Sequence, residues 1–346
     1  MSKSIYRRTL LIAALFCSLC SGRAQQRSIQ SINSNWQFHK GEIKQGLPSG
    51  DPSTGWEAIS LPHTWNRADV TDDEPGYYRG TGWYLKTLYI DPSLKGKDVY
   101  LYFEGANQVT EVFVNGKKAG EHTGGYTAFS FPIGSLLQFG DSSTPNQLLV
   151  KVNNAYSDDI PPLSADFTFY GGIYRDVYLV AASPVHFDMD NNASGGVFIT
   201  TPFVSNAYAT VELKGAVTNR ARLAGDWLVE TTLADAEGKI IAQQQSRLSA
   251  DAGRNGNFVQ TLKNIRHPRL WSPDDPYLYR VVVKLVDKQS GRELDQYAHP
   301  LGFRWFQFDA NRGFYLNGQP LKLMGANRHQ DYKGLGNALP DALHVN

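Results

Sequence analysis

The stretch EVFVNGKKAG, Glu111–Gly120, gives the clearest indication of fold class in this sequence. Strand-forming residues lead into Asn115-Gly116, a dipeptide that readily takes the positive φ angles required by both central positions of a type I′ turn. The stretch therefore predicts a β-hairpin. Short runs with a period of two surround it between Gly, Pro and Asn turns, and no sustained helical period of 3.6 residues interrupts them.

The same pattern extends from residue 28 to residue 182. Each run places alternate side chains on opposite faces of a strand, as in a sheet with one buried face. The clearest runs are VYLYFEG (99–105), NQLLVKV (146–152) and GIYRDVYLV (172–180). About 150 residues of such strands predict a β-sandwich of jelly-roll type over residues 28–182.

A second β region is predicted over residues 183–308. Pro184 favours a boundary because proline cannot donate to a continuing ladder. Turns at Glu237-Gly238 and Ser290-Gly291 separate longer alternating runs. This spacing predicts an immunoglobulin-like sandwich without the cysteine pair found in many such domains.

The pattern changes again over residues 309–346. A hairpin at Asn317-Gly318 leads into Leu321–Met324, which we expect to be a buried strand of the kind found in parallel sheets. Asn327-Arg328-His329 follow it, as active-site residues follow the strands of a (β/α)₈ barrel. The alternative is a solvated loop in which Arg328 pairs with Asp331.

The N-terminus predicts a signal peptide over residues 1–24. A basic start is followed by an apolar run, Leu10–Leu19, that is too short to cross a bilayer, with cleavage expected after Ala24. Cys20 leaves a lipoprotein open as an alternative. The sequence has two cysteines, Cys17 and Cys20, so the mature chain is expected to contain no disulfide or thiolate metal site. Export to the periplasm or the extracellular space is the expectation.

Composition sets limits on partners. The 346 residues carry a formal net charge of +1, which gives no electrostatic case for nucleic acid or an anionic membrane surface. No second apolar run is long enough for a membrane span. Aromatic residues make up 12% of the chain; they suit strands in general and sugar-stacking surfaces in particular.

Several motifs in order along the chain carry a family resemblance. They are LPHTW (61–65), YYRGTGWY (77–84), DFTFYGGIYRDVYL (166–179), RLWSPDDPYLY (269–279), GFR (302–304) and LNGQPLKLMGANRHQDY (316–332). Together they resemble the front of family 2 glycoside hydrolases, which include β-galactosidases, β-glucuronidases and β-mannosidases. The run at 325–341 is most similar to β-galactosidases of Bacteroidetes. The resemblance implies a jelly-roll sugar-binding domain, an immunoglobulin-like domain and the start of a catalytic (β/α)₈ barrel at 309–346.

The resemblance also implies substrate-binding residues for an oligosaccharide or other β-glycoside. His329 matches a family position that hydrogen-bonds a sugar hydroxyl, with Asn327 and Arg328 beside it; Arg328 is expected mainly to support its neighbours through an ion pair. Asp166 matches a sandwich-domain aspartate that reaches sugar hydroxyls and helps to bind a monovalent cation, and its alternative is an Asx-turn or strand-end cap. Na⁺ and Mg²⁺ stay open as cofactors, and a homo-oligomer stays open, for the complete enzyme.

Some motif residues are expected to be structural instead. His63 and Trp83 are predicted to be packed residues, Tyr78 and Arg79 to lie near the junction with the barrel, and Arg175-Asp176 to form an ion pair at a strand face.

The two catalytic glutamates of the family are not among these residues. A retaining glycosidase needs two carboxyl groups about 5–5.5 Å apart, one as acid/base and one as nucleophile. The last glutamate in the sequence is Glu293, in the second predicted sandwich. The chain by itself is therefore expected to be inactive. The alternative is a non-catalytic, exported carbohydrate-binding protein of two sandwiches, in which residues 309–346 would lack sheet neighbours.

Overall fold

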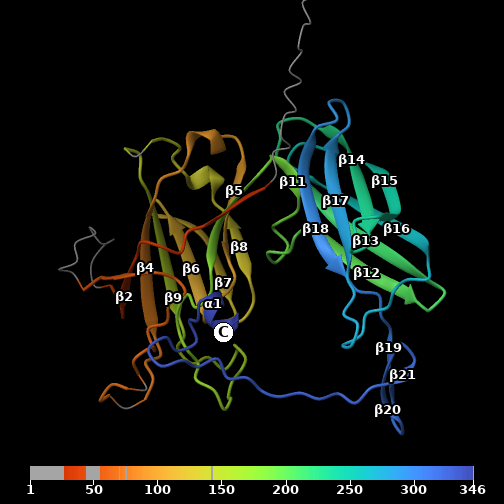
Figure 1. Ribbon diagram of the computed structural model, residues 1–346. Coiled ribbons are helices and arrows are strands. Elements are labelled where there is room, and N and C mark those ends of the chain that lie inside the picture. The colour runs from red at the N-terminus through yellow and green to blue at the C-terminus, as the bar shows by residue number, and fades with distance from the viewer. Residues whose placement is uncertain (1–26, 44–54, 70, 75, 142, 346) are drawn as a thin grey trace, which may run out of the picture.

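The computed structural model describes residues 27–43, 55–69, 71–74, 76–141 and 143–345 (Figure 1). These residues form two successive β-sandwiches and a C-terminal segment that runs back from the second sandwich to the first. The predicted mainly β fold is confirmed. The predicted signal peptide, its cleavage site and both cysteines lie outside the described residues.

The first sandwich consists of two antiparallel sheets, with strand orders β3-β2-β4-β9-β6-β7 and β1-β10-β5-β8. Trp36, Tyr84 and Phe103 are fully or almost fully buried between them. Two short 3₁₀ turns, Pro92–Leu94 and Gly134–Leu136, lie in its loops. The strands are β1 (Ser28–Ser31), β2 (Trp36–Lys40), β3 (Glu57–Ile59), β4 (Thr81–Leu88), β5 (Asp98–Phe103), β6 (Val109–Val114), β7 (Lys117–Thr123), β8 (Phe129–Pro132), β9 (Asn146–Asn153) and β10 (Val177–Ala182).

The predicted hairpin at Asn115-Gly116 joins β6 to β7. The two turn residues have φ angles of 50° and 76°, which fits the primed turn that the dipeptide favours. In β6, Val112 and Val114 are fully buried and Glu111 and Phe113 are partly exposed, so alternate residues face the core.

The second sandwich pairs a sheet of β11, β12, β13 and β16 with a sheet of order β15-β14-β17-β18. Its core includes Phe187, Leu213 and Val283. The strands are β11 (Val185–Phe187), β12 (Val197–Val204), β13 (Tyr208–Asn219), β14 (Gly225–Ala234), β15 (Ile240–Ala250), β16 (Asn255–Arg266), β17 (Tyr279–Asp287) and β18 (Glu293–Leu301).

Polar contacts join the two sandwiches. Arg27, next to β1, donates two hydrogen bonds of 2.8 Å, one to the Phe187 carbonyl and one to the carboxylate of Asp295 in β18. Asp295 is 1% exposed. In a second contact, the Tyr100 hydroxyl of β5 lies 3.2 Å from His186 Nε2 of β11. Tyr100 is fully buried although it faces away from the first core, because the second sandwich covers that face.

The C-terminal segment begins with a small antiparallel sheet of β19 (Phe306–Asp309), β20 (Gly313–Leu316) and β21 (Gln319–Pro320). The predicted turn at Asn317-Gly318 joins β20 to β21, with φ angles of 53° and 78°. The chain then runs toward the first sandwich and ends in a short helix, α1 (Asp341–Val345) (Figure 1).

Residues 321–331 form no strand, against the prediction of a buried strand over Leu321–Met324. Leu323 and Met324 are 64% and 86% exposed. The reason is physical: a largely apolar strand is stable only between sheet neighbours and under cover on both faces, and the described residues supply neither. The assignment of this segment to the start of a barrel stays a prediction.

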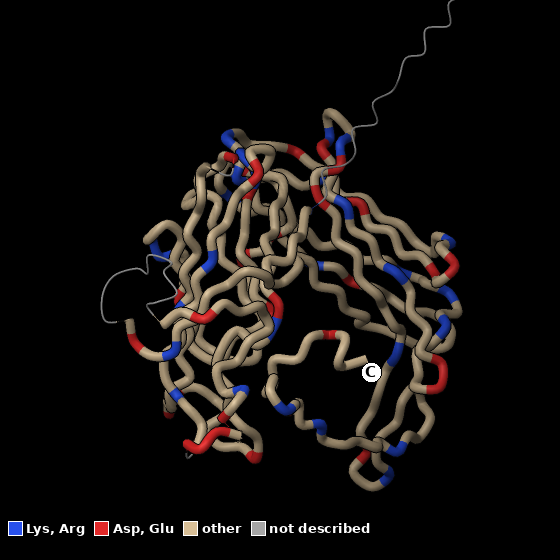
Figure 2. The backbone as a smooth tube through the Cα atoms, turned by 60° about the vertical axis from the view of Figure 1, so that its left-hand side comes forward, with Lys and Arg blue, Asp and Glu red and all other residues tan. Residues whose placement is uncertain are grey.

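Charge is distributed evenly over the molecule. Figure 2 shows acidic and basic residues interspersed along both sandwiches, in keeping with the net charge of +1. No helix among the described residues is long and apolar enough to cross a membrane.

Candidate functional site

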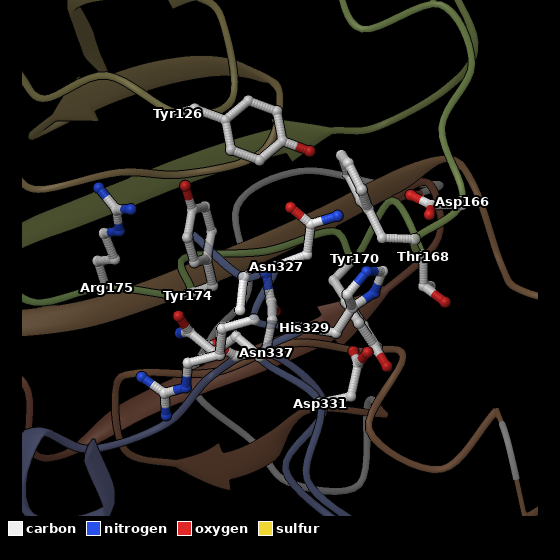
Figure 3. Close-up of a pocket in the computed structure, with 14 residues that line it drawn as sticks. Tyr126, Asp166, Thr168, Tyr170, Tyr174, Arg175, Asn327, His329, Asp331 and Asn337 are labelled. Atoms are coloured by element: carbon white, nitrogen blue, oxygen red, sulfur yellow. The ribbon is translucent and has the colours of Figure 1, made fainter. Parts of the chain in front are cut away.

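A cavity of about 500 Å³ lies where residues 166–175 of the first sandwich meet residues 326–337 of the C-terminal segment (Figure 3). Its lining combines aromatic rings, amides and charged groups. The structure brings all four predicted substrate-binding residues to this one cavity: Asp166, Asn327, Arg328 and His329. Their role in binding stays a prediction.

The sandwich wall of the cavity includes Tyr170, which lies in the loop Phe169–Gly172; this loop belongs to no strand, and an isolated bridge pairs Gly172 with Asn107. Four side chains from three segments of the chain hold its backbone. The Phe169 and Tyr170 carbonyls accept hydrogen bonds, and the Gly171 amide and carbonyl are both paired. Asn154 donates to the Phe169 carbonyl at 2.9 Å, and Asn107 donates to the Tyr170 carbonyl at 2.6 Å. Asn66 accepts from the Gly171 amide at 2.7 Å, and Thr64 donates to the Gly171 carbonyl at 2.7 Å. A loop whose polar groups are satisfied in this way is rigid, although it lies outside the sheets.

The opposite wall is the segment that carries Asn327–Asp331. Gln330 Nε2 donates a hydrogen bond of 3.1 Å to the Asn337 carbonyl, which links the two ends of this wall. A tight turn follows, with an isolated bridge between Tyr332 and Gly336. The wall is therefore folded back on itself rather than extended.

His329 is exposed and lies beside an aromatic residue of the sandwich. Its ring centroid is 6.5 Å from that of Phe167, with an interplanar angle of 73°. Figure 3 shows Arg175 and Asp166 toward opposite ends of the cavity, with His329 and Asn327 between them. An imidazole and an amide can each donate and accept hydrogen bonds, as sugar hydroxyls require.

Three tyrosines supply neutral hydroxyl groups and ring faces. Burial raises the pKa of Tyr174 to about 12 and also raises the pKa of Tyr126. Burial, and then the Asp331 carboxylate, raise the pKa of Tyr170. The Tyr174 hydroxyl donates to the Gly125 carbonyl at 2.7 Å, so it is fixed in place. These groups stay uncharged at neutral pH and suit a hydroxyl-rich ligand.

The predicted cation at Asp166 stays a prediction. Asp166 is exposed, and among the residues that the structure describes no group of three or more Asp, Glu, His or Cys side chains is placed to hold a metal. Hard cations need several oxygen ligands, so carbonyl or amide oxygens would have to complete a site at this residue.

The carboxylates that line the cavity are Asp166 and Asp331. Glu293, the last glutamate in the sequence, lies in β18 of the second sandwich and pairs with Lys284 at 2.8 Å. The described residues of the cavity offer hydrogen-bonding groups and ring faces, but they do not include the pair of glutamates that the family resemblance leads us to expect of a retaining enzyme.

His63, Trp83 and Arg79 lie outside the lining of this cavity. His63 is buried, as predicted, with Nδ1 3.0 Å from the Tyr84 hydroxyl. Trp83 is half-buried in a small apolar cluster, and Arg79 Nε donates to the Asn154 carbonyl at 2.9 Å.

The predicted ion pair between Arg175 and Asp176 is not formed. Arg175 lies over the Tyr174 ring at 5.2 Å, and Asp176 accepts a hydrogen bond of 3.0 Å from Tyr178. Arg175 lies in a bend just before β10, and the two side chains have different neighbours.

Two sequence models of one enzyme family match the chain. The model of the sugar binding domain of glycosyl hydrolases family 2 matches residues 27–183, and the model named glycosyl hydrolases family 2 matches residues 194–304. The chain belongs to glycoside hydrolase family 2. The predicted family is thus confirmed.

Relatives of this family 2 chain carry two enzyme names. A β-glucuronidase of Bacteroides fragilis is 38% identical to this chain, and the match covers 97% of this chain and 46% of the relative. A β-galactosidase of Bacteroides ovatus is 32% identical, and the match covers 92% of this chain and 36% of the relative. The crystal structure of a Bacteroides uniformis β-glucuronidase superimposes with a TM-score of 0.87 at 42% identity, covering 92% of this chain and 37% of that one. The chain spans less than half the length of these relatives.

Sequence reasoning missed the residues that build the rigid wall. Asn66, Asn107 and Asn154 are isolated amides in three loops or strand ends, and only the folded chain brings them to residues 169–172. The available signal was the Gly171-Gly172 pair, since paired glycines often mark a close approach of backbone to other groups. A Cβ at Gly171 would lie 2.0 Å from Trp65.

Proposed function

We propose that this chain is the N-terminal part of an exported, retaining β-glycosidase and that the cavity beside His329 binds the sugar of a terminal β-glycoside. The observation that carries the proposal is the meeting of residues 166–175 and 326–337 around one cavity in a family 2 chain. Aromatic faces, amides and carboxylates around a cavity are the groups that recognise a pyranose ring and its hydroxyls.

We propose a β-glucuronide as the first substrate class and a β-galactoside as the second. The support comes from the relatives: those named β-glucuronidase reach 38% and 42% identity, and the β-galactosidase of B. ovatus reaches 32%. The cavity contains two arginines, Arg175 and Arg328, which would favour a sugar that bears a carboxylate. Export is proposed from the basic start and apolar run of residues 1–24.

Ligand binding is the first test. We expect glucuronic acid to bind the chain weakly, with a Kd on the order of 1 mM, because a single sugar ring makes few contacts. His329→Gln and Asp166→Asn should each weaken this binding about fivefold or more, the cost of one lost hydrogen bond to a ligand. Calorimetry or ligand-observed NMR measures the affinity.

His299→Gln is the matched control, because His299 is exposed in β18 of the second sandwich. It should bind as the unaltered chain does. Equal affinity in the His299, His329 and Asp166 variants would contradict the placement of the sugar in this cavity.

Turnover is the second test. The chain has no glutamate after Glu293, and both catalytic carboxyl groups are proposed to come from family residues that this sequence does not include. We expect no release of chromophore from a nitrophenyl β-glucuronide or β-galactoside. Hydrolysis by a pure sample that is lost in the Asp166→Asn or Asp331→Asn variant would refute this account of the missing carboxylates.

A further inference from the structure

Residues 332–339 form a compact turn that docks on the first sandwich beside the cavity. The Tyr332 amide donates to the Gly336 carbonyl at 3.0 Å, and the Gly336 amide donates back to the Tyr332 carbonyl at 2.9 Å. After the turn, Ala338 and Leu339 are 3% and 7% exposed. Burial of these two side chains contributes to holding the segment on the sandwich.

Gly336 lies close to the sandwich in this docking. Its φ of +58° lies in the left-handed region, and a Cβ at this position would lie 2.8 Å from Tyr170 Cε1 and 2.9 Å from Thr64 Cγ2. Both distances are shorter than real Cβ contacts. The backbone of the segment thus lies directly against the Tyr170 ring, and only glycine leaves room for this approach.

Tyr170 cannot move aside easily. It is 5% exposed, its carbonyl accepts the hydrogen bond from Asn107, and its loop is the rigid wall described above. Tyr77 also meets its ring edge-to-face, with the ring centroids 6.2 Å apart at an interplanar angle of 82°. With its backbone bonded and its ring in contact with both Tyr77 and the Gly336 turn, Tyr170 offers a fixed surface to the C-terminal segment.

We propose that Tyr170 and Gly336 are positioning residues, which hold Asn327–Asp331 against the sandwich so that His329 faces the cavity before a ligand arrives. Two features connect this docking to His329. Gln330 donates a hydrogen bond to the Asn337 carbonyl. The Asp331 carboxylate lies close enough to Tyr170 to raise the pKa of its hydroxyl. The residue that follows His329 is therefore tied to the docked turn, and pre-organisation of this kind lowers the cost of ordering a loop on binding.

The docking of residues 332–339 is a property of the chain itself. The inference rests on the proposed function only where it takes His329 to contact a sugar. It also gives the first sandwich a second role. Besides lining the cavity, this sandwich sets the position of the opposite wall.

A pair of glycine variants tests the proposal. Gly334 and Gly336 both have positive φ, +80° and +58°, but a Cβ at Gly334 would meet nothing within 4 Å. Gly334→Ala therefore reproduces the backbone strain without the clash, and Gly336→Ala adds the clash with Tyr170. Tyr170→Phe is the milder second variant, because it keeps the ring and removes only the hydroxyl beside the Asp331 carboxylate.

The readout is the ring-proton NMR signal of His329, assigned by its loss in His329→Gln. The neighbouring Phe167 ring shifts this signal only while the loop is docked. We expect Gly336→Ala to move the signal to its position in a flexible peptide, Tyr170→Phe to move it part of the way, and Gly334→Ala to leave it in place. An unchanged signal in Gly336→Ala, or an equal change in Gly334→Ala, overturns the proposal.

Affinity for glucuronic acid separates this inference from the proposed function. We expect a fall of about fivefold in Gly336→Ala, of the size of one lost hydrogen bond. If the NMR signal responds as expected and the unaltered chain binds no sugar, the positioning role stands and the proposed sugar site fails.

Discussion

At the scale of single residues, buried histidines set the response of the fold to acid. Burial, the larger cause, lowers the pKa of His63 to about 3 and that of His186 to about 3. Both are therefore neutral in the folded chain at pH 7. Asp98 acts in the opposite sense, because burial raises its pKa to about 6.

His63 gives a testable pH dependence. Between pH 6.5 and about 3 the unfolded chain protonates this histidine and the folded chain does not, so the free energy of unfolding falls as the pH falls. We expect His63→Gln to lower Tm at pH 7, because the variant loses the contact with Tyr84. Between pH 7 and about pH 4.5, however, the variant should lose less stability than the unaltered chain does. Thermal unfolding followed by circular dichroism at both pH values measures this.

The control is His299→Gln, which replaces an exposed histidine of β18. Its loss of stability between the two pH values should match that of the unaltered chain. If His63→Gln showed the same pH slope as this control, the protonation of His63 would not contribute to acid unfolding.

At the scale of elements, turns were predictable from the sequence and one strand was not. Asn115-Gly116 and Asn317-Gly318 both take positive φ angles between paired strands, because the dipeptide itself favours that backbone. Leu321–Met324 has the composition of a buried strand, but a strand depends on neighbours that local sequence does not supply. The four predicted site residues lie at one cavity, whereas the asparagines that fix its wall are scattered along the chain and carried no local signal.

The small sheet β19-β20-β21 exposes a cluster of phenylalanine rings. Phe306 and Phe308 are 61% and 70% exposed, and the Phe308 ring centroid lies 5.1 Å from that of Phe314. Exposed apolar clusters of this kind promote association. We expect Phe308→Ser to reduce self-association of the chain in light scattering and to reduce the binding of a hydrophobic dye.

Leu223→Ser serves as the comparison, because Leu223 is 77% exposed and lies outside this cluster of rings. It should change both signals less than Phe308→Ser does. Equal effects of the two variants would show that the cluster has no special part in association.

At the scale of the whole molecule, the two sandwiches are tied together by buried polar contacts. The Arg27 side chain is 14% exposed and its partner Asp295 is 1% exposed, so loss of the arginine would leave a carboxylate buried without its counter-charge. Sequence patterns placed both sandwiches, but a contact between residues 268 positions apart has no local signature.

We expect Arg27→Gln to lower the free energy of unfolding by about 3 kcal/mol, the usual cost of breaking a buried ion pair. Arg312→Gln breaks an exposed pair with Asp309, where the arginine side chain is 72% exposed, and should have little effect because solvent screens such pairs. Urea denaturation of the two variants measures the difference. Equal costs would show that the Arg27 pair does not stabilise the contact between the sandwiches.

The rigid loop Phe169–Gly172 has one more consequence, which concerns how ligands of different size are accommodated. Four side chains from three segments of the first sandwich fix this loop, so it cannot yield without disturbing the sandwich itself. Adjustment to a bulkier sugar should therefore come from the lining residues outside this loop and outside the docked turn, among them residues 166–168 and 326–329. Among chains that share this loop, differences in ligand preference should accumulate in those two segments, where a substitution can reshape the cavity and leave the sandwich undisturbed.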